Sequence, residues 1–406
     1  MTMLQPITGK RRWYIVPILM VIVALGLHAV SLRIDLTPPI LELEGIEKGK
    51  TYRGHVTLNI FITDSESGLA SLRLTLDDVP QPLAQNEIEA GHVSWLFDTT
   101  SLPDGCHVIS IDAVDKSIFR NIAQQRFEFL IDNTSPQIYV PPESLSVGQG
   151  KTLPLFILID EPAAQVEGKL FGWDFACYPV PSNTYYRGLI GISVSHPPKT
   201  YPLALRVVDL VGNTAEEVFQ LEVKRTKFQR GGYVALSPAK RRTMMNTAKS
   251  RADNLKRGKA YTQSTKFESQ LWNGKFIQPA HGRLTSSFGK YRKYNTGVRR
   301  HHLGIDIANT VGTPIYASNS GIVALAARLH LYGKSVVINH GQGVSSSYNH
   351  LSKIHVAAEE QVEKGQLLGW MGATGQVTGS HLHWGMVVNG IAVDPEEWIE
   401  RDFSTP

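Results

Sequence analysis

The chain has 406 residues, of which 42% are hydrophobic, and its formal net charge is +5 at pH 7. This length predicts two to four domains, and the ordinary apolar content predicts a globular protein. The sequence contains only two cysteines, Cys106 and Cys177, which excludes a cysteine-based zinc finger.

An uncharged stretch near the N-terminus predicts a membrane anchor. Residues 10–12 are all basic, and residues 13–32 contain no Lys, Arg, Asp or Glu. About twenty apolar residues cross the core of a bilayer. The basic flank predicts that residues 1–12 are cytoplasmic and that the rest of the chain lies beyond the cytoplasmic (inner) membrane. A cleaved signal peptide is the alternative, but the apolar run is long and its best cleavage site, near Ala29, is poor.

An internal repeat follows the anchor. Asp35 recurs 97 residues later as Asp132, and Asp115 recurs 94 residues later as Asp209. Both offsets suit one β-sandwich of immunoglobulin size. We therefore predict two Ig-like domains, residues 35–132 and residues 133–224.

Alternating apolar residues predict the strands of the first sandwich, with a turn at residues 64–68. The two sets of inward-facing residues are Val56, Leu58, Ile60 and Ile62, and Leu72, Leu74 and Leu76. The sandwiches are expected to act as spacers, and adhesion is the alternative. The Asp209, Gly212 and Asn213 pattern suits either calcium binding or turn chemistry, and we favour the turn. Cys106 and Cys177 are expected as two buried thiols, with a disulfide as the alternative.

Residues 225–269 are predicted to form a basic, partly helical connector. Residues 224–266 contain thirteen Lys and Arg and a single acid, Asp253. Three interpretations stay open. The segment is a solvated linker, or its charge binds anionic lipids or wall polymers, or it forms a gate across the active-site groove.

Five polar residues in the last third of the chain carry the functional signal: His302, Asp306, His350, His381 and His383. They supply two imidazoles and a carboxylate for zinc, and two further imidazoles for chemistry beside it. A hydrolytic zinc site needs three protein ligands and one open position. Residues two or four apart share a face of a strand, so His302 and Asp306, and His381 and His383, are each predicted to point together. Leu303, Ile305 and Ile307 would then point into the core.

Residues 276–398 resemble the M23 family of zinc peptidases, the lysostaphin-like peptidoglycan endopeptidases. The match is dense and follows the family's order through residues 282–289, 302–306, 312–317, 336–341, 348–352, 372–375 and 379–384. Ser380 stands where the family has proline, and the family's arginine after Phe288-Gly289 is displaced to Arg292. We expect that displacement to affect substrate contacts more than the metal.

The resemblance implies a role for each residue of the constellation. His302, Asp306 and His383 would be the zinc ligands, and His350 and His381 would be the catalytic histidines. Zinc would lower the pKa of a bound water to about 7. One of the two histidines would handle its proton and the other would stabilise the oxyanion, in an order that the sequence leaves open. Tyr348 is expected to pack rather than to act.

The resemblance and the anchor together predict a mainly β, membrane-anchored zinc endopeptidase that cleaves peptide cross-links or bridges of peptidoglycan. The expected partners are peptidoglycan stems, the cytoplasmic membrane through residues 13–32, and cell-wall or division proteins, but no nucleic acid. The alternatives are a non-catalytic activator of cell-wall amidases and an adhesion or assembly protein. The predicted organisation is a cytoplasmic N-terminus (1–12), an anchor (13–32), two Ig-like domains (35–132 and 133–224), a basic linker (225–269) and an antiparallel β peptidase domain (270–400).

Overall fold

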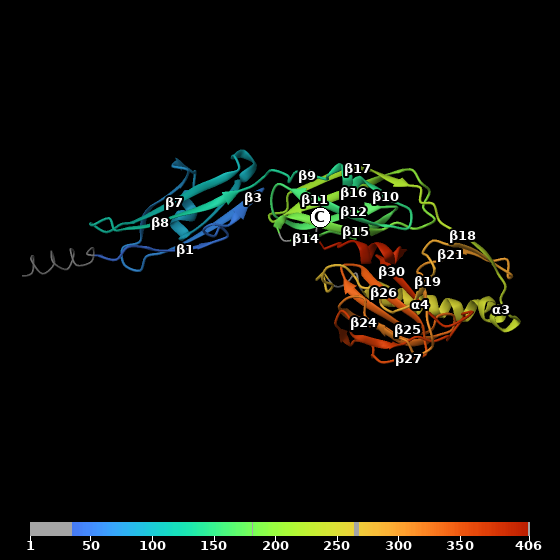
Figure 1. Ribbon diagram of the computed structural model, residues 1–406. Helices are drawn as coiled ribbons and strands as arrows, with labels where there is room; N and C mark the ends of the chain where they lie inside the picture. Colours follow the sequence, from blue (N-terminus) through green and yellow to red (C-terminus); the bar gives the residue numbers. More distant parts are fainter. Residues whose placement is uncertain (1–34, 181, 264–267, 405–406) are drawn as a thin grey trace, which may run out of the picture. The chain divides into compact units, whose positions relative to one another are not determined.

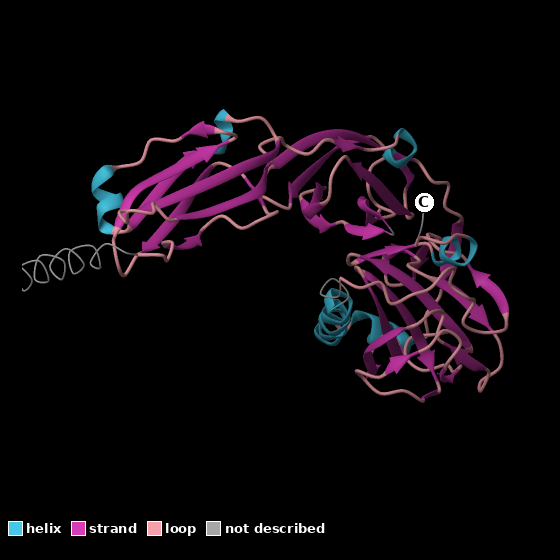
Figure 2. Ribbon diagram, turned by 90° about the vertical axis from the view of Figure 1, so that its left-hand side faces the viewer, coloured by secondary structure: helices cyan, strands magenta, loops and turns pink. Residues whose placement is uncertain are grey.

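The computed structural model describes residues 35–180, 182–263 and 268–404. The protein is mainly β, as predicted, with many more strands than helices in the described chain (Figure 2). Contacts divide it into two compact units, which meet between Thr134 and Ser135. The predicted anchor, residues 13–32, lies outside the described residues. Within the described ranges, no helix combines the length and apolar character needed to span a membrane.

The first unit consists of two mainly antiparallel sheets that enclose one apolar core. Its helical segments are α2 (Gln85–Ala90) and the 3-10 turn η1 (Thr99–Ser101). The smaller sheet has the order β1 (Ile40–Glu44), β3 (His55–Thr63), β6 (His92–Asp98). The larger sheet has the order β2 (Thr51–Tyr52), β8 (Ile122–Ile131), β7 (Gly105–Asp115), β4 (Leu69–Leu76), β5 (Val79–Pro80).

The predicted alternation forms the core of this unit. All seven predicted apolar residues of β3 and β4 are buried, and Ile60 and Leu58 are completely enclosed. The predicted turn at residues 64–68 is also confirmed, because Asp64 Oδ1 accepts hydrogen bonds from the backbone N–H groups of Glu66, Ser67 and Gly68. An aspartate carboxylate that accepts the backbone N–H groups of the following turn allows two strands to be joined by a short connection.

The second unit begins with another pair of facing sheets. They share a core of buried aliphatic and aromatic residues, and the 3-10 turn η2 (Pro142–Leu145) precedes β10. One sheet has the order β10 (Ser146–Gly148), β17 (Thr214–Lys224), β16 (Thr200–Asp209), β12 (Ala163–Leu170), β13 (Trp173–Ala176). The other has the order β14 (Tyr178–Val180), β15 (Ser182–Gly191), β11 (Thr152–Ile159), β9 (Ile138–Tyr139).

Two smaller predictions are tested by these sandwiches. Asp209 Oδ1 accepts the backbone N–H groups of Val211, Gly212 and Asn213, so the favoured turn is confirmed. Asp209 also lies close to Glu161 in an acidic group of the kind that could hold a metal ion, so the turn does not decide the question of calcium. Both cysteines are free thiols, but only Cys177 is buried, and the expectation of two buried thiols is wrong for the exposed Cys106.

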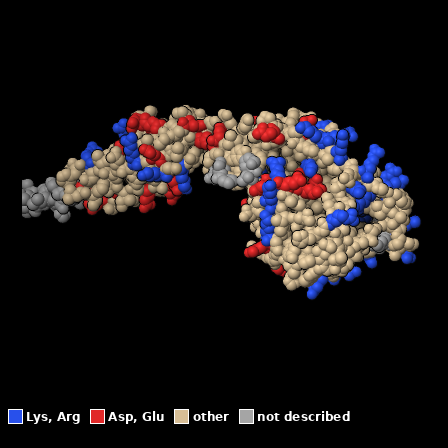
Figure 3. Space-filling model, viewed as in Figure 1, with Lys and Arg blue, Asp and Glu red and all other residues tan. Residues whose placement is uncertain are grey.

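The basic connector is folded onto the C-terminal domain. It contains β18 (Arg230–Val234), α3 (Pro238–Met245) and α4 (Thr247–Gln263). Strand β18 forms a small sheet with β20 (Tyr291–Tyr294) and β21 (Arg299–His301). Helix α4 lies against β24 and β25 (Figure 1). Lys and Arg side chains gather over the end of the unit that carries β18 and β21 (Figure 3).

The C-terminal domain is built on one long, mainly antiparallel sheet over an apolar core. The sheet has the order β19 (Arg283–Ser286), β22 (Ile305–Ala308), β30 (His381–Val388), β26 (Val344–Leu351), β25 (Gly333–Gly341), β24 (Gly321–Leu329), β28 (Gln361–Val362), and β31 (Ile391–Val393) pairs with β30. A smaller sheet has the order β23 (Pro314–Tyr316), β29 (Leu367–Trp370), β27 (Lys353–Ile354). The last helix is α5 (Pro395–Glu400).

The second sandwich and the C-terminal domain share an interface with both apolar and polar contacts. Leu189 belongs to the core of the C-terminal domain. The almost fully buried Arg187 donates from Nη1 to the carbonyl of Phe403 at 2.6 Å. Glu397 of α5 accepts from the N–H and hydroxyl of Thr152 at 2.8 and 2.7 Å. Such polar contacts fix one relative arrangement of the two parts, because breaking any of them leaves a polar group without a hydrogen-bond partner.

Glu397 makes this interface sensitive to pH. Burial raises the pKa of its carboxyl to about 7, against the opposing effect of the Thr152 hydrogen bonds. Since the folded pKa exceeds the unfolded one, the folded state holds the proton more tightly, and stability falls as pH rises from 4.5 through 7.

We predict that Glu397→Gln abolishes this fall, so that the native chain loses about 3 kcal/mol relative to the variant between pH 4.5 and 8. Urea unfolding at several pH values measures the difference. Glu400→Gln, on the same helix and exposed, is the matched control. Parallel pH profiles for native chain and Glu397→Gln would contradict the assignment.

Candidate active site

The pairing of β22 with β30 places the site. These neighbouring antiparallel strands are in a register that sets Asp306 directly opposite His383. His381 and His383 lie on one face of β30, and Leu382 between them is completely buried on the other, as the spacing predicted. Strand β26 lies on the far side of β30 and ends with His350 and Leu351.

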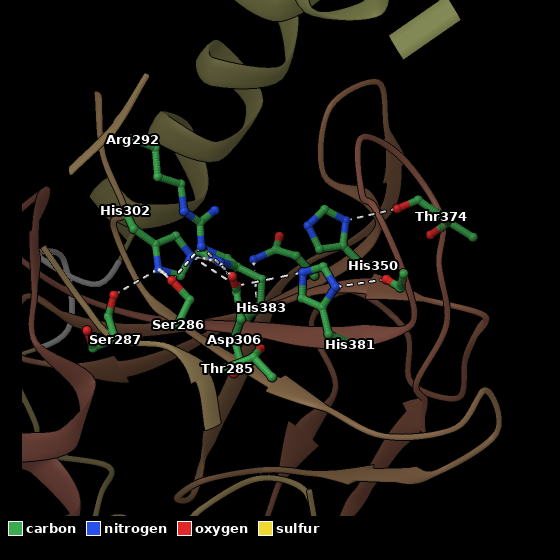
Figure 4. Close-up of polar contacts among 12 residues, drawn as sticks. Thr285, Ser286, Ser287, Arg292, His302, Asp306, His350, Thr374, His381 and His383 are labelled. Atoms are coloured by element: carbon green, nitrogen blue, oxygen red, sulfur yellow. Dashed lines mark hydrogen bonds and ion pairs between the residues drawn. The ribbon is translucent and has the colours of Figure 1, made fainter. Parts of the chain in front are cut away.

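Three side chains converge at this point. His302 Nε2 lies 2.9 Å from His383 Nδ1 and 2.9 Å from Asp306 Oδ1. His383 Nδ1 lies 2.9 Å from the same carboxylate oxygen. The two nitrogens and one oxygen therefore form a compact triangle that is open toward the groove (Figure 4).

His302 reaches this triangle from a bend and not from a strand. The predicted strand over residues 302–306 begins only at Ile305, so Leu303 is 49% exposed and the prediction that it enters the core is wrong. Gly304 explains the bend. A Cβ there would lie 2.5 Å from the carbonyl oxygen of Trp384 and 2.7 Å from the His383 ring, so only glycine allows the chain to pass.

A second layer of contacts orients the three ligand groups. His302 Nδ1 lies 3.0 Å from the carbonyl oxygen of Ser287, which fixes that nitrogen as the donor and leaves Nε2 as the acceptor. Arg292 donates from Nη2 to Asp306 Oδ2 at 2.8 Å and also to the hydroxyl of Ser286. The displaced arginine thus holds a ligand carboxylate, a contact that sequence reasoning assigned instead to the substrate.

His350 and His381 face the triangle from its open side. His350 Nδ1 lies 2.9 Å from the Thr374 carbonyl oxygen, and His381 Nδ1 lies 2.9 Å from that of Gly379. With Nδ1 of each ring occupied, Nε2 of each is left for the groove, and the two ring centres are 5.0 Å apart. The neighbouring Tyr348 is completely buried and shares a hydrogen bond with Ser318, so its side chain belongs to the core, as predicted.

The backbone of His350 is strained. Its φ is +70°, in the left-handed region that residues other than glycine rarely occupy. Its N–H donates to the carbonyl of Tyr332 at 2.9 Å, which holds this conformation. Strain of this kind costs of order 1–3 kcal/mol and is concentrated at functional sites.

Burial favours the neutral form of two imidazoles of the site. Burial, together with the neighbouring His383 and His381, lowers the pKa of His350 to about 3. Burial also lowers the pKa of His383 to about 4, against the opposing effect of its hydrogen bond to Asp306. Burial alone would raise the pKa of Asp306, but the close contacts of its carboxylate with the rings of His302 and His383 outweigh it and hold that pKa far below its usual range. A carboxylate beside imidazole nitrogens is a donor set for a divalent cation.

The donor set fits zinc in type and number. Two imidazole nitrogens and one carboxylate oxygen, each within 4.8 Å of the others, match a three-ligand site that keeps a position open. Asp306 and His383 come from neighbouring strands, His302 comes from the bend before β22, and contacts from Ser287 and Arg292 orient the group, which is the arrangement expected of a metal centre.

The structure brings all five predicted residues into one pocket of about 750 Å³. It also brings in residues that sequence reasoning left out of the site. One wall is made by the basic connector, with Leu236, Asn254, Arg257 and Tyr261. The only sequence signal for this wall was the connector's charge, which allowed the interpretation of a gate but named no residue.

A convergent His/Asp triangle with two more histidines beside it, held on a β-sheet, has the donor set of a metal centre. Residues 300–395 match peptidase family M23. The match lies in the C-terminal domain and contains all five residues of the candidate site.

The chain is similar to two curated peptidoglycan enzymes. It is 40% identical over 113 residues to the peptidoglycan DD-endopeptidase ShyA of Vibrio cholerae serotype O1, a match that covers 28% of this chain and 26% of that protein. It is 39% identical over 120 residues to the DD-carboxypeptidase/endopeptidase Mpg of Neisseria meningitidis serogroup B, which covers 29% and 28%. The chain thus spans little more than a quarter of the length of these relatives.

Among solved structures, the chain is similar to a putative peptidase M23 from Pseudomonas aeruginosa. The identity is 26%, the match covers 62% of this chain and 93% of that one, and the TM-score is 0.46.

Arg292 provides a test of the outer contacts. We predict that Arg292→Lys, which keeps the charge but loses the guanidinium nitrogen Nη2 that contacts both Asp306 and Ser286, weakens Zn²⁺ affinity about tenfold. Competition with a chromogenic chelator measures the affinity. Arg299→Lys, the same change at an exposed position of β21, should leave it unaltered. Equal affinities for all three proteins would remove Arg292 from the metal centre.

Proposed function

We propose that this protein is a zinc-dependent endopeptidase that cleaves peptide cross-links or bridges of peptidoglycan. The observation that carries the proposal is the convergence of His302, Asp306 and His383 beside His350 and His381 in an M23 domain. The printed activities of the relatives, peptidoglycan DD-endopeptidase and DD-carboxypeptidase/endopeptidase, support the substrate class.

The three convergent groups would hold the zinc ion. When bound, zinc supplies a Lewis acid and an activated water at neutral pH. Arg292 keeps Asp306 aligned for this task, and the Ser287 carbonyl keeps His302 in the ligating tautomer. The outer contacts thereby reduce the reorganisation that metal binding requires.

His350 and His381 would serve the substrate. Their Nδ1 atoms are bound to backbone carbonyls, so the Nε2 atom of each ring is available in the groove. One imidazole takes up the proton that the nucleophile releases and passes it to the leaving amine. The other would stabilise the negative charge that develops on the oxygen of the scissile amide once a proton has reached its Nε2, because its Nδ1 proton is already held by a backbone carbonyl.

The remaining parts would deliver this site to the cell wall. In this proposal residues 13–32 form the membrane anchor, residues 1–12 are cytoplasmic and the chain after residue 32 is extracytoplasmic, in line with the basic residues 10–12. The paired-sheet domains would act as Ig-like spacers that carry the peptidase away from the membrane. Cell-wall or division proteins are candidate partners, and one relative, 36% identical over 114 residues, is the cell division protein DipM of Caulobacter vibrioides.

Digestion of purified sacculi tests the proposal. The full chain, loaded with zinc, is expected to release un-cross-linked muropeptides from cross-linked dimers, and a chelator should stop this until zinc is restored. Mass spectrometry of the products names the bond. Intact dimers after incubation with zinc-loaded chain would overturn the endopeptidase and leave the amidase activator, which is checked by adding an amidase to the same sacculi.

His350 separates chemistry from metal binding. We predict that His350→Ala retains its zinc but loses activity by at least about 100-fold, because general acid–base groups contribute roughly this factor or more. Zinc content by atomic absorption and product formation are measured on the same sample. His281→Ala, at an exposed position outside the pocket, is the control. Activity within a few-fold of native in His350→Ala would exclude His350 from the reaction.

A further inference from the structure

Helix α4 carries a cation into the active-site pocket. Arg257, Asn254 and Tyr261 line the same pocket as the three ligand groups and the two further histidines. The helix passes beside the site in the close-up (Figure 4). A positive charge near a hydrolytic centre bears on which substrates can enter it.

The helix is fixed where it lies. Asp253, only 5% exposed, accepts the backbone N–H groups of His330 and Leu331 at 3.0 and 2.8 Å. This contact ties α4 to the turn between β24 and β25. Arg257 comes four residues later and so lies on the same side of the helix, toward the domain.

Two tyrosines hold the guanidinium group. It stacks on Tyr332 with Cζ 3.7 Å from the ring centre, and Nη2 donates to the hydroxyl of Tyr261 at 2.5 Å. Tyr332 is also the residue whose carbonyl accepts the N–H of His350. The platform under Arg257 is therefore joined directly to the strained backbone of His350.

The guanidinium group is incompletely satisfied. Its Nε is shielded from solvent and has no hydrogen-bond acceptor within the described part of the chain. The contacts recorded there are with tyrosines and not with a carboxylate. The enclosed Nε leaves the cation without a counter-charge, and a substrate would approach the guanidinium group from the pocket that Arg257 lines. A planar guanidinium is well suited to a carboxylate.

We propose that Arg257 binds a carboxylate of the substrate peptide beside the scissile amide and thereby selects substrates that carry a negative charge at that position. This inference rests on the proposed function and adds a substrate preference to it. The carboxylate comes either from the C-terminus of a stem peptide or from the side chain of a cross-linking diamino acid. Both present the same planar acceptor, and the test separates them.

The test uses the zinc-loaded full chain and two pairs of synthetic cross-linked stem peptides. Within each pair a single carboxylate is replaced by a carboxamide, at the C-terminus in one pair and on the diamino acid in the other. The pair in which the native chain prefers the carboxylate by kcat/KM identifies the group that is bound.

Arg257→Gln should then lose about 10- to 100-fold in kcat/KM on the preferred carboxylate peptide, which is the range for a hydrogen bond to a charged group. It should change little on the matching carboxamide, so that the preference collapses. Arg257→Lys should restore part of it. Arg251→Gln removes the same charge from an exposed position of the same helix and should leave the preference intact.

A second readout is independent of catalysis. Binding of the same peptides to the metal-free chain, measured by calorimetry, should favour the carboxylate in the native chain but not in Arg257→Gln. Zinc content and thermal midpoint of each variant show whether the fold and the metal centre are intact. If the native chain cleaves no peptide and no sacculi, the proposed function fails, and the binding measurement still decides the role of Arg257.

Three results would overturn the inference. Equal losses on carboxylate and carboxamide peptides would make Arg257 a support for α4. Faster cleavage of both peptides by Arg257→Gln would make α4 an obstruction of the groove. Equal binding of both peptides by the native metal-free chain would show that no carboxylate is recognised.

Discussion

The antiparallel register between β22 and β30 is the constraint on which the site depends. It sets Asp306 opposite His383, and a slip of one residue would turn both side chains to the buried face. The sheet secures this register through apolar residues on the other face, such as Ile307 and Leu382, which are enclosed in the core. Hydrophobic packing on one side of the sheet thus fixes polar geometry on the other.

Around this pair, each further group is held by a main-chain contact. The carbonyl oxygens of Ser287, Thr374 and Gly379 each occupy one nitrogen of a histidine ring and so choose its tautomer. These three carbonyls lie in loops next to the sheet, and their contacts orient the rings without a metal or substrate. This preorganisation is what a hydrolytic site requires, since reorganisation during the reaction adds to its barrier.

The sequence predicted the features that depend only on neighbouring residues. The alternation of apolar residues around Ile60 and Leu74 predicted strands, and the spacing of His381 and His383 predicted that both point to one face of a strand. Other features depend on distant contacts. Leu303 is exposed because the bend at Gly304 accommodates the ring of His383, which is far away in sequence. The docking of α4 depends on Asp253 meeting backbone groups of residues 330 and 331, for which the helix itself carries no periodic signal.

The interface built by Arg187, Thr152 and Glu397 has a consequence for how such chains diversify. The sequence has an obvious module boundary after Lys224, yet packing and hydrogen bonds cross it, and Leu189 lies in the C-terminal core. A recombination event that transferred the hydrolase without its preceding sandwich would uncover apolar surface and leave a buried carboxyl without its donors. The compact unit of this protein is therefore the second sandwich together with the C-terminal domain, and it begins at Ser135.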